Sequence, residues 1–253
     1  MIEVKNVYKS FGTHEVLKDI SAKFIPGTTN LIIGASGSGK TTLMKCMVGL
    51  HEVSSGEVYY NGRDFTKFDF KERIPIRKEI GMLFQGVALF DSMTVEENIM
   101  FPLNMFSEQS LSEKRDRVNF CLERVNLKGI NKLMPDELSG GMRKRVGIAR
   151  AIAMKPQYLY CDEPNSGLDP RTSILIDQLI HEITHEFNMT TIVVTHDMNS
   201  VMEIGEHIIF IADGFLKWEG NNQDILHSDN AALDDFIFAS KFMLALKKNN
   251  KAN

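Results

Sequence analysis

Polar and apolar residues alternate near the start of the chain, in residues 2–8 (IEVKNVY) and 14–25 (HEVLKDISAKFI). A period of two places alternate side chains on opposite faces of a strand. The pattern predicts antiparallel strands at an edge of the fold. Residues 56–65 (GEVYYNGRDF) return to this pattern and predict a hairpin around Asn61-Gly62, a dipeptide suited to a tight turn.

Further along, short apolar runs replace the alternation, and each predicts a buried strand. These runs are residues 28–34 (TTNLIIG), 78–85 (KEIGMLFQ), 157–163 (QYLYCDE), 190–197 (TTIVVTHD) and 207–220 (HIIFIADGFLKWEG, a hairpin around Asp213-Gly214). Residues 39–50 and 171–187 lie between them with apolar residues at helical spacing. Buried strands that alternate with helices predict an α/β fold with a mostly parallel sheet.

The middle of the chain, residues 86–153, has a helical pattern and predicts an inserted α-helical subdomain. Its expected helices are residues 94–103 (TVEENIMFPL), interrupted by Pro102, residues 112–125 (SEKRDRVNFCLERV) and the run after Ser139. Residues 221–253 are expected to form a C-terminal helical tail with a frayed end.

Composition excludes several classes of protein. With 253 residues, 43% hydrophobic and 25% charged, the chain suits one large domain, and its net charge of −4 leaves no overall basic face for nucleic acid. Its 3 cysteines are far apart, which disfavours a disulfide framework or zinc site and favours small buried side chains in a reducing cytosol. No signal peptide is evident, and no apolar run approaches the ~20 residues of a membrane span. We therefore expect the chain to reach a membrane only through a partner.

Residues 34–41 (GASGSGKT) match G-x-x-x-x-G-K-[ST] between a predicted strand and a predicted helix. Backbone N–H groups of such a loop wrap a phosphate, Lys40 bridges the β- and γ-phosphates, and the Thr41 hydroxyl binds Mg²⁺. The alternative is a flexible glycine turn. The predicted ATP-binding residues of this loop are Gly34, Ala35, Ser36, Gly37, Ser38, Gly39, Lys40, Thr41 and Thr42.

Polar side chains end three of the predicted strands, where ligands bind in open α/β sheets. Asp162 is expected to hold Mg²⁺, and Glu163 to act as the general base that orients the attacking water. His196 is expected to contact the γ-phosphate or that water. Gln85 is expected to ligate Mg²⁺ and to act as a hinge at the start of the insertion. The alternative is that strands simply end in polar residues.

The stretch ELSGGMRKR, residues 137–145, predicts a second anion site. Ser139 is a good helix N-cap, and Gly140 and Gly141 are expected at the helix entrance, where backbone N–H groups attract anions. Because the chain already has one phosphate loop, two sites predict a head-to-tail homodimer with C₂ symmetry. Each ATP would be held by one chain's loop and capped by the partner chain's Ser139, Gly140 and Gly141.

The motifs GASGSGKT, Gln85, LSGGM, YLYCDEP, NSGLDP and VTHD occur in an order that resembles the ATP-binding cassette (ABC) transporter ATPases. The resemblance implies a P-loop NTPase fold. Its RecA-like core and N-terminal antiparallel β subdomain would occupy residues 1–85 and 154–220, and its helical signature subdomain residues 86–153. It also implies that Phe11, in KSFG, stacks on adenine and that the loop from Ser166 to Asp169 communicates across the dimer.

The signature reads LSGGM where most of the family resembles LSGGQ, and the segment after Gln85 reads FQGVALFDSMTVEENIMFPL. Both resemble the ATPases of Mla/MCE lipid transport in bacterial envelopes. That resemblance implies an integral-membrane permease of the MlaE type, an MCE-type substrate-binding protein, and a cytoplasmic location on the inner face of the cell membrane. An ATPase for amino-acid or lipoprotein transport and a cassette ATPase of cell division stay open as alternatives.

Overall fold

The computed structural model describes residues 1–238, and the chain forms two compact units. Of the described residues, unit 1 holds Met1–Ile25, Thr29–Lys67 and 194–238, and unit 2 holds Pro26–Thr28 and Phe68–Val193. The predicted helical insertion therefore falls inside unit 2, together with two of the predicted strands. Of the predicted C-terminal tail, the structure describes η3 (Asp224–His227) and α8 (Ala231–Ile237), whereas residues 239–253 lie outside the described part.

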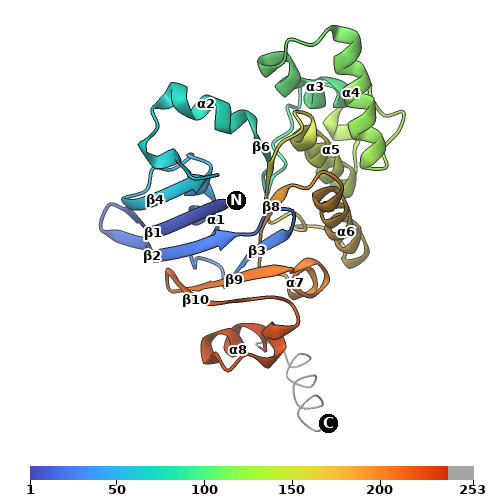
Figure 1. The fold of residues 1–253 in the computed structure, drawn as a ribbon. Coiled ribbons are helices and arrows are strands. Elements are labelled where there is room, and N and C mark those ends of the chain that lie inside the picture. The colour runs from blue at the N-terminus through green and yellow to red at the C-terminus, as the bar shows by residue number, and fades with distance from the viewer. Residues whose placement is uncertain (239–253) are drawn as a thin grey trace. The chain divides into compact units, whose positions relative to one another are not determined.

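An antiparallel sheet in unit 1 confirms the alternating pattern at the start of the chain. Ile2 pairs with Phe24 and Phe11 with His14, and most apolar residues of the pattern, such as Val4, are buried. The strand order is β2-β1-β4-β5, and Figure 1 labels the first three of these strands. The strands are β1 (Ile2–Phe11), β2 (His14–Phe24), β4 (Ser55–Tyr60) and β5 (Arg63–Asp64), and η1 (Phe65–Lys67) follows.

A second group of strands in unit 1 has the order β10-β9-β3. All five residues of β3 are buried, as its apolar run predicts, and β3 pairs with β9 in parallel. The hairpin from β9 to β10 turns at Asp213 and Gly214, both with positive φ, which confirms the predicted turn. The elements are β3 (Thr29–Ile33), α1 (Lys40–Met47), α7 (Met198–Ile204), β9 (His207–Ala212) and β10 (Phe215–Gly220).

The strands of unit 2 lie in the order β8-β7-β6, and β6 and β7 pair in parallel. Every residue of β7 and β8 is buried, which confirms that their apolar runs are core strands. Strand β8 runs across the boundary, because its last two residues belong to unit 1. The elements are β6 (Ile80–Leu83), β7 (Tyr158–Asp162), α6 (Pro170–Glu186) and β8 (Thr190–Thr195).

Unit 2 also contains the predicted helices, which Figure 1 shows as a group around α3, α4 and α5. The expected break at Pro102 is wrong, because α3 continues through it to Phe106. Burial of Ile99 and Leu103 on either side of the proline stabilises the helix, which outweighs the lost backbone hydrogen bond. The predicted helices are α3 (Val95–Phe106), α4 (Leu111–Arg124) and α5 (Gly140–Ile152), and unit 2 also contains α2 (Phe70–Lys78) and η2 (Pro135–Glu137), which were not predicted.

Candidate functional site

The phosphate loop predicted from the sequence joins β3 to α1 in unit 1. Gly34 has φ of 148°, and a Cβ atom there would lie 2.2 Å from the carbonyl oxygen of Ile211, so only glycine fits. The loop enters α1 through Gly39, whose backbone is left-handed. These constraints build the strand–loop–helix geometry that the motif needs to surround a phosphate.

Two buried polar side chains of this loop are suited to an anion. Lys40 is 6% exposed, and its Nζ donates hydrogen bonds of 2.9 Å to the carbonyl oxygens of Gly34 and Ala35. The Ser38 hydroxyl is buried with no hydrogen-bond partner among the residues that the structure describes. A buried ammonium and a buried hydroxyl beside a helix N-terminus fit the phosphate groups of a nucleotide.

Phe11 and His196 also belong to unit 1. Phe11 ends β1, is 46% exposed, and has the Lys9 Nζ 4.8 Å from its ring centre and the His51 ring edge-on at 5.3 Å. His196 follows β8 and is exposed. The next residue, Asp197, caps α7 and donates its own N–H to the Thr195 hydroxyl at 3.0 Å. Both Phe11 and His196 are therefore accessible to a ligand.

The acid pair lies in unit 2, at the end of β7. Asp162 is 6% exposed and ends the strand, whereas Glu163 is half-buried and has φ of 47°. A left-handed residue directly after a strand turns the chain sharply, and here the Ser166 N–H closes the turn on the Glu163 carbonyl oxygen at 3.1 Å. Backbone strain at a carboxylate that follows a buried strand is typical of functional sites.

The second anion site, at the start of α5, has the capping geometry that the sequence predicts. Ser139 is the N-cap, and its hydroxyl accepts the Met142 N–H at 3.3 Å. The amides of Gly140 and Gly141 are in the first helical turn and have no acceptor within the helix. At Gly141 a Cβ atom would lie 2.7 Å from Thr172 in α6, so glycine lets the two helix starts approach closely.

Sequence reasoning missed two basic residues of α5 that contact the segment around Gln85. The Nζ of Lys144 donates to the Gln85 carbonyl oxygen, and the Arg150 guanidinium donates to the carbonyl oxygens of Val87 and Ala88. Strand β6 ends at Leu83, two residues earlier than predicted, because the chain then turns through left-handed backbone at Val87 and Ala88. Lys144 and Arg150 lie six residues apart in a helix that is mostly buried, and basic residues in such a helix could have suggested that they contact polar groups inside the protein.

Each unit thus holds a separate set of the predicted residues. Unit 1 contains the phosphate loop, Phe11 and His196, and unit 2 contains Gln85, Asp162, Glu163 and the start of α5. Hydroxyl, amide and carboxylate oxygens are ligands that Mg²⁺ prefers, so Thr41, Gln85 and Asp162 have the right chemistry for that ion.

None of the helices in residues 1–238 combines the length and apolar character that a membrane crossing requires. The chain thus has no spanning helix of its own within the described part.

Known proteins resemble this chain over most of its length. The ribonucleotide transport ATP-binding protein mkl of Mycobacterium leprae, described as probable, is 37% identical over 93% of this chain and 68% of its own length. The intermembrane phospholipid transport ATP-binding protein MlaF of Haemophilus influenzae is 36% identical over 94% of this chain and 90% of its own. The chain spans about two thirds of the length of the mycobacterial relatives that it matches.

A solved structure has the same fold. The bacterial ABC transporter cassette MJ0796, in a dimeric structure, superposes with a TM-score of 0.80 at 35% identity, covering 88% of this chain and 99% of that one. The family described as ABC transporter matches residues 17–166, which include the phosphate loop, the signature and the acid pair. The chain therefore belongs to the ABC transporter family, as one of its ATP-binding ATPase cassettes.

Proposed function

We propose that this ATPase powers the movement of phospholipid or another lipid between bacterial envelope membranes. Its partners would be an MlaE-type permease and an MCE-type substrate-binding protein, with the ATPase at the inner face of the cell membrane. The observation that carries this assignment is the LSGGM signature together with the segment after Gln85. The MlaF relative supports it, while the similarly distant mkl relative, with ribonucleotide transport in its name, supplies the competing cargo.

In this proposal, residues 34–42 hold the phosphates of ATP, with Lys40 as the cation and Phe11 as the adenine platform. Thr41, Gln85 and Asp162 would hold Mg²⁺, which neutralises phosphate charge when bound. Glu163 is the general base for the attacking water, and His196 contacts the γ-phosphate. The buried position of Lys40, the exposed ring of Phe11 and the turn at Glu163 support these roles.

We also propose that two copies of the chain form a head-to-tail homodimer. The Ser139 hydroxyl and the amides of Gly140 and Gly141 of one copy would cap the γ-phosphate of ATP held by the other. The open first turn of α5 supports this role, because its N–H groups need an acceptor outside the helix. The cassette MJ0796 has a dimeric structure, which supports the pairing.

An apolar groove in unit 2 suits contact with the permease. It has a volume of about 370 Å³ and includes Phe84, directly before Gln85 in sequence, and Ala88 and Phe90, shortly after it, together with Phe101 and Pro102 of α3. Phe84 is 36% and Phe90 39% exposed, so apolar rings are presented to solvent beside a proposed Mg²⁺ ligand. We propose that a short cytoplasmic helix of the permease occupies this groove, where its movement would reach Gln85.

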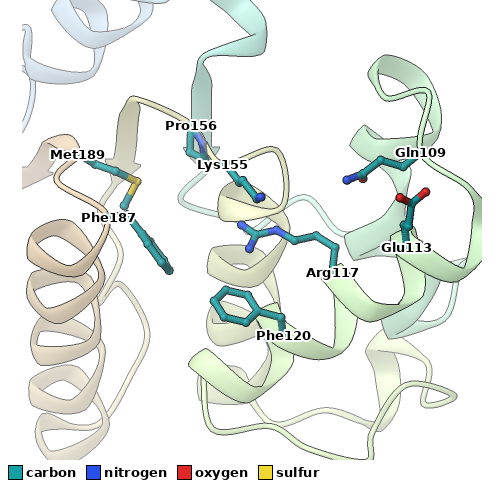
Figure 2. A pocket seen from close by; sticks show the side chains of 8 residues that line it. All are labelled: Gln109, Glu113, Arg117, Phe120, Lys155, Pro156, Phe187 and Met189. Atoms are coloured by element: carbon teal, nitrogen blue, oxygen red, sulfur yellow. The ribbon is translucent and has the colours of Figure 1, made fainter.

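Phe90→Ser tests the groove, and Phe120→Ser is a matched control. Phe120 is 38% exposed and packs on Phe187 with ring centres 6.2 Å apart, as Phe90 packs on Phe101 at 4.7 Å. Phe120 belongs to α4 and lines a different pocket (Figure 2). We expect Phe90→Ser to reduce co-purification with the permease while the isolated chain keeps its ATP turnover, and Phe120→Ser to change neither. Equal losses in both variants would contradict the groove assignment.

The cargo is tested by purifying the tagged chain from membranes of its source and identifying the permease and the extractable small molecules. An MlaE-type permease with an MCE protein and bound phospholipid supports the proposal. A permease of another type, with an amino acid, nucleotide or lipoprotein, contradicts the lipid assignment. Phospholipid that stimulates ATP turnover of the reconstituted complex would then support lipid as the transported molecule.

A further inference from the structure

One face of helix α5 binds the segment that contains Gln85. Lys144, Gly147 and Arg150 are spaced by three residues, so they lie along the same side of the helix. All three meet residues 83–88, which include the last residue of β6 and the start of the segment that leads to α3. Figure 1 shows β6 running beside α5 in unit 2. Helix α5, whose N-cap is Ser139, thus contacts the segment that contains Gln85, the side chain that we assign to Mg²⁺.

Lys144 joins two parts of the proposed catalytic site through their backbone. Its side chain is 4% exposed, and its Nζ lies 2.7 Å from the Gln85 carbonyl oxygen and 3.3 Å from the Glu163 carbonyl oxygen. Burial lowers the pKa of this ammonium, whereas Cys161, Glu163 and Asp162 oppose that shift. A buried cation needs acceptors close by, and here these are the two carbonyl groups next to the side chains that the proposed mechanism uses.

Gly147 and Arg150 hold the next residues of the segment. A Cβ atom at position 147 would lie 2.6 Å from Val87 Cγ1 and 2.7 Å from Leu83 Cδ1, so glycine allows the close approach. The Arg150 guanidinium donates to the Val87 carbonyl oxygen at 2.6 Å and to that of Ala88 at 2.7 Å. Val87 and Ala88 have φ of 63° and 52°, a conformation that a β-branched residue such as valine rarely adopts without outside support.

We propose that Lys144 and Arg150 are positioning residues that hold the Gln85 segment and the Glu163 backbone on helix α5. This proposal rests on the proposed roles of Gln85 and Glu163. Ser139, Gly140 and Gly141 lie at the start of the same helix. The partner chain's nucleotide, when bound there, would therefore move together with the Gln85 segment and the Glu163 backbone. Neither positioning residue belongs to the phosphate loop, so their loss should slow hydrolysis more than it weakens ATP binding.

The test uses the full chain with Lys144→Met and Arg150→Met, which keep an unbranched apolar stem and remove the donors. ATP affinity, turnover and amide hydrogen exchange are measured in each variant. We expect turnover to fall about tenfold or more with ATP affinity within about threefold of wild type, the pattern of a lost transition-state effect. We also expect faster exchange in peptides that cover residues 84–90 and 161–167. Lys128→Met, at an exposed lysine of unit 2, is the matched control and should change neither quantity.

Lys144→Arg and Arg150→Lys separate positioning from general loss of structure, because they restore a cation at each site. Partial recovery of turnover and of local protection supports the proposal. Turnover and exchange at wild-type levels in both methionine variants would overturn it, as would exchange that rises throughout unit 2 without recovery in the conservative variants. Glu163→Gln is assayed alongside. If that variant hydrolyses ATP normally, the proposed base is wrong, whereas the exchange data still test the positioning contacts.

Discussion

The ammonium of Lys40 lies 2.9 Å from the carbonyl oxygen of Gly34, six residues earlier in the chain. This hydrogen bond ties the lysine to the start of the loop, and such a tie restricts the loop's conformational freedom and so lowers the cost of ordering it on binding. Hydrogen bonds between ions and polar groups are worth about 1.5–3 kcal/mol each. The lysine is therefore expected to contribute both to the shape of the loop and to its affinity for nucleotide.

Lys40→Ala should weaken ATP binding by about tenfold to a hundredfold, because one or two charge-assisted contacts are lost. Isothermal titration calorimetry measures the affinity directly. Lys45→Ala, in the same helix and outside the motif, is the control and should bind nearly as tightly as wild type. If Lys40→Ala binds ATP like the wild type, the phosphate loop has been misassigned.

Ser139→Arg should abolish steady-state ATP turnover without removing ATP binding by the single chain, because a long cation blocks the cap on the partner chain's nucleotide. It should also destabilise the fold by about 1 kcal/mol through the lost N-cap. Ser110→Arg is a matched control, since Ser110 caps α4 with the same 3.3 Å hydrogen bond to an N–H of the first turn. Turnover that survives Ser139→Arg, or is equally lost in Ser110→Arg, argues against the composite site.

The three cysteines should make stability fall at high pH. Burial raises the pKa of Cys46 and Cys121 to about 11 and of Cys161 to about 12, from an ordinary value of 9.0. Above pH 9 the unfolded thiols lose protons that the native thiols keep, so the native state binds more protons and the free energy of unfolding decreases, through about pH 11 for Cys46 and Cys121 and about pH 12 for Cys161.

Urea unfolding at pH 8 and pH 10.5 measures this loss. The triple Cys→Ala variant should lose less stability between the two pH values, because it has no buried thiols to titrate. The native thiols should also react slowly with a disulfide reagent at pH 8 and quickly in urea. Equal pH dependence in both proteins, together with rapid native labelling, would contradict the burial of these side chains.

Local patterns were sufficient to predict much of the fold. The apolar runs of β3, β7 and β8, the turn at Asp213-Gly214 and the cap at Ser139 each depend on a few neighbouring residues, so spacing alone reveals them. Helix α2 was missed although Asp69 and Glu72 form a capping box, because Pro75 interrupts its short helical pattern.

The contacts of Lys144 and Arg150 could not be derived in this way. A lysine on a helix is usually exposed, and only the packing of α5 against residues 83–88 turns Lys144 inward to two carbonyl groups. The left-handed backbone at Val87 is equally hidden, since valine disfavours it and tertiary contacts alone can stabilise it. Long-range packing was therefore the missing information, in the helix through Pro102 as well as in this segment.

Glu163→Gln tests the central claim most directly, with ATP turnover and the mass of the ATP-bound species measured on the same preparation. The amide keeps the shape of the side chain but cannot accept the proton of the attacking water. We predict ATP binding near the wild-type level, turnover lower by about a hundredfold or more, and a stable dimer that retains one ATP per chain. Glu182→Gln, on the exposed side of α6, should behave as wild type. Wild-type turnover in Glu163→Gln, or a variant that stays monomeric with bound ATP, would contradict the account.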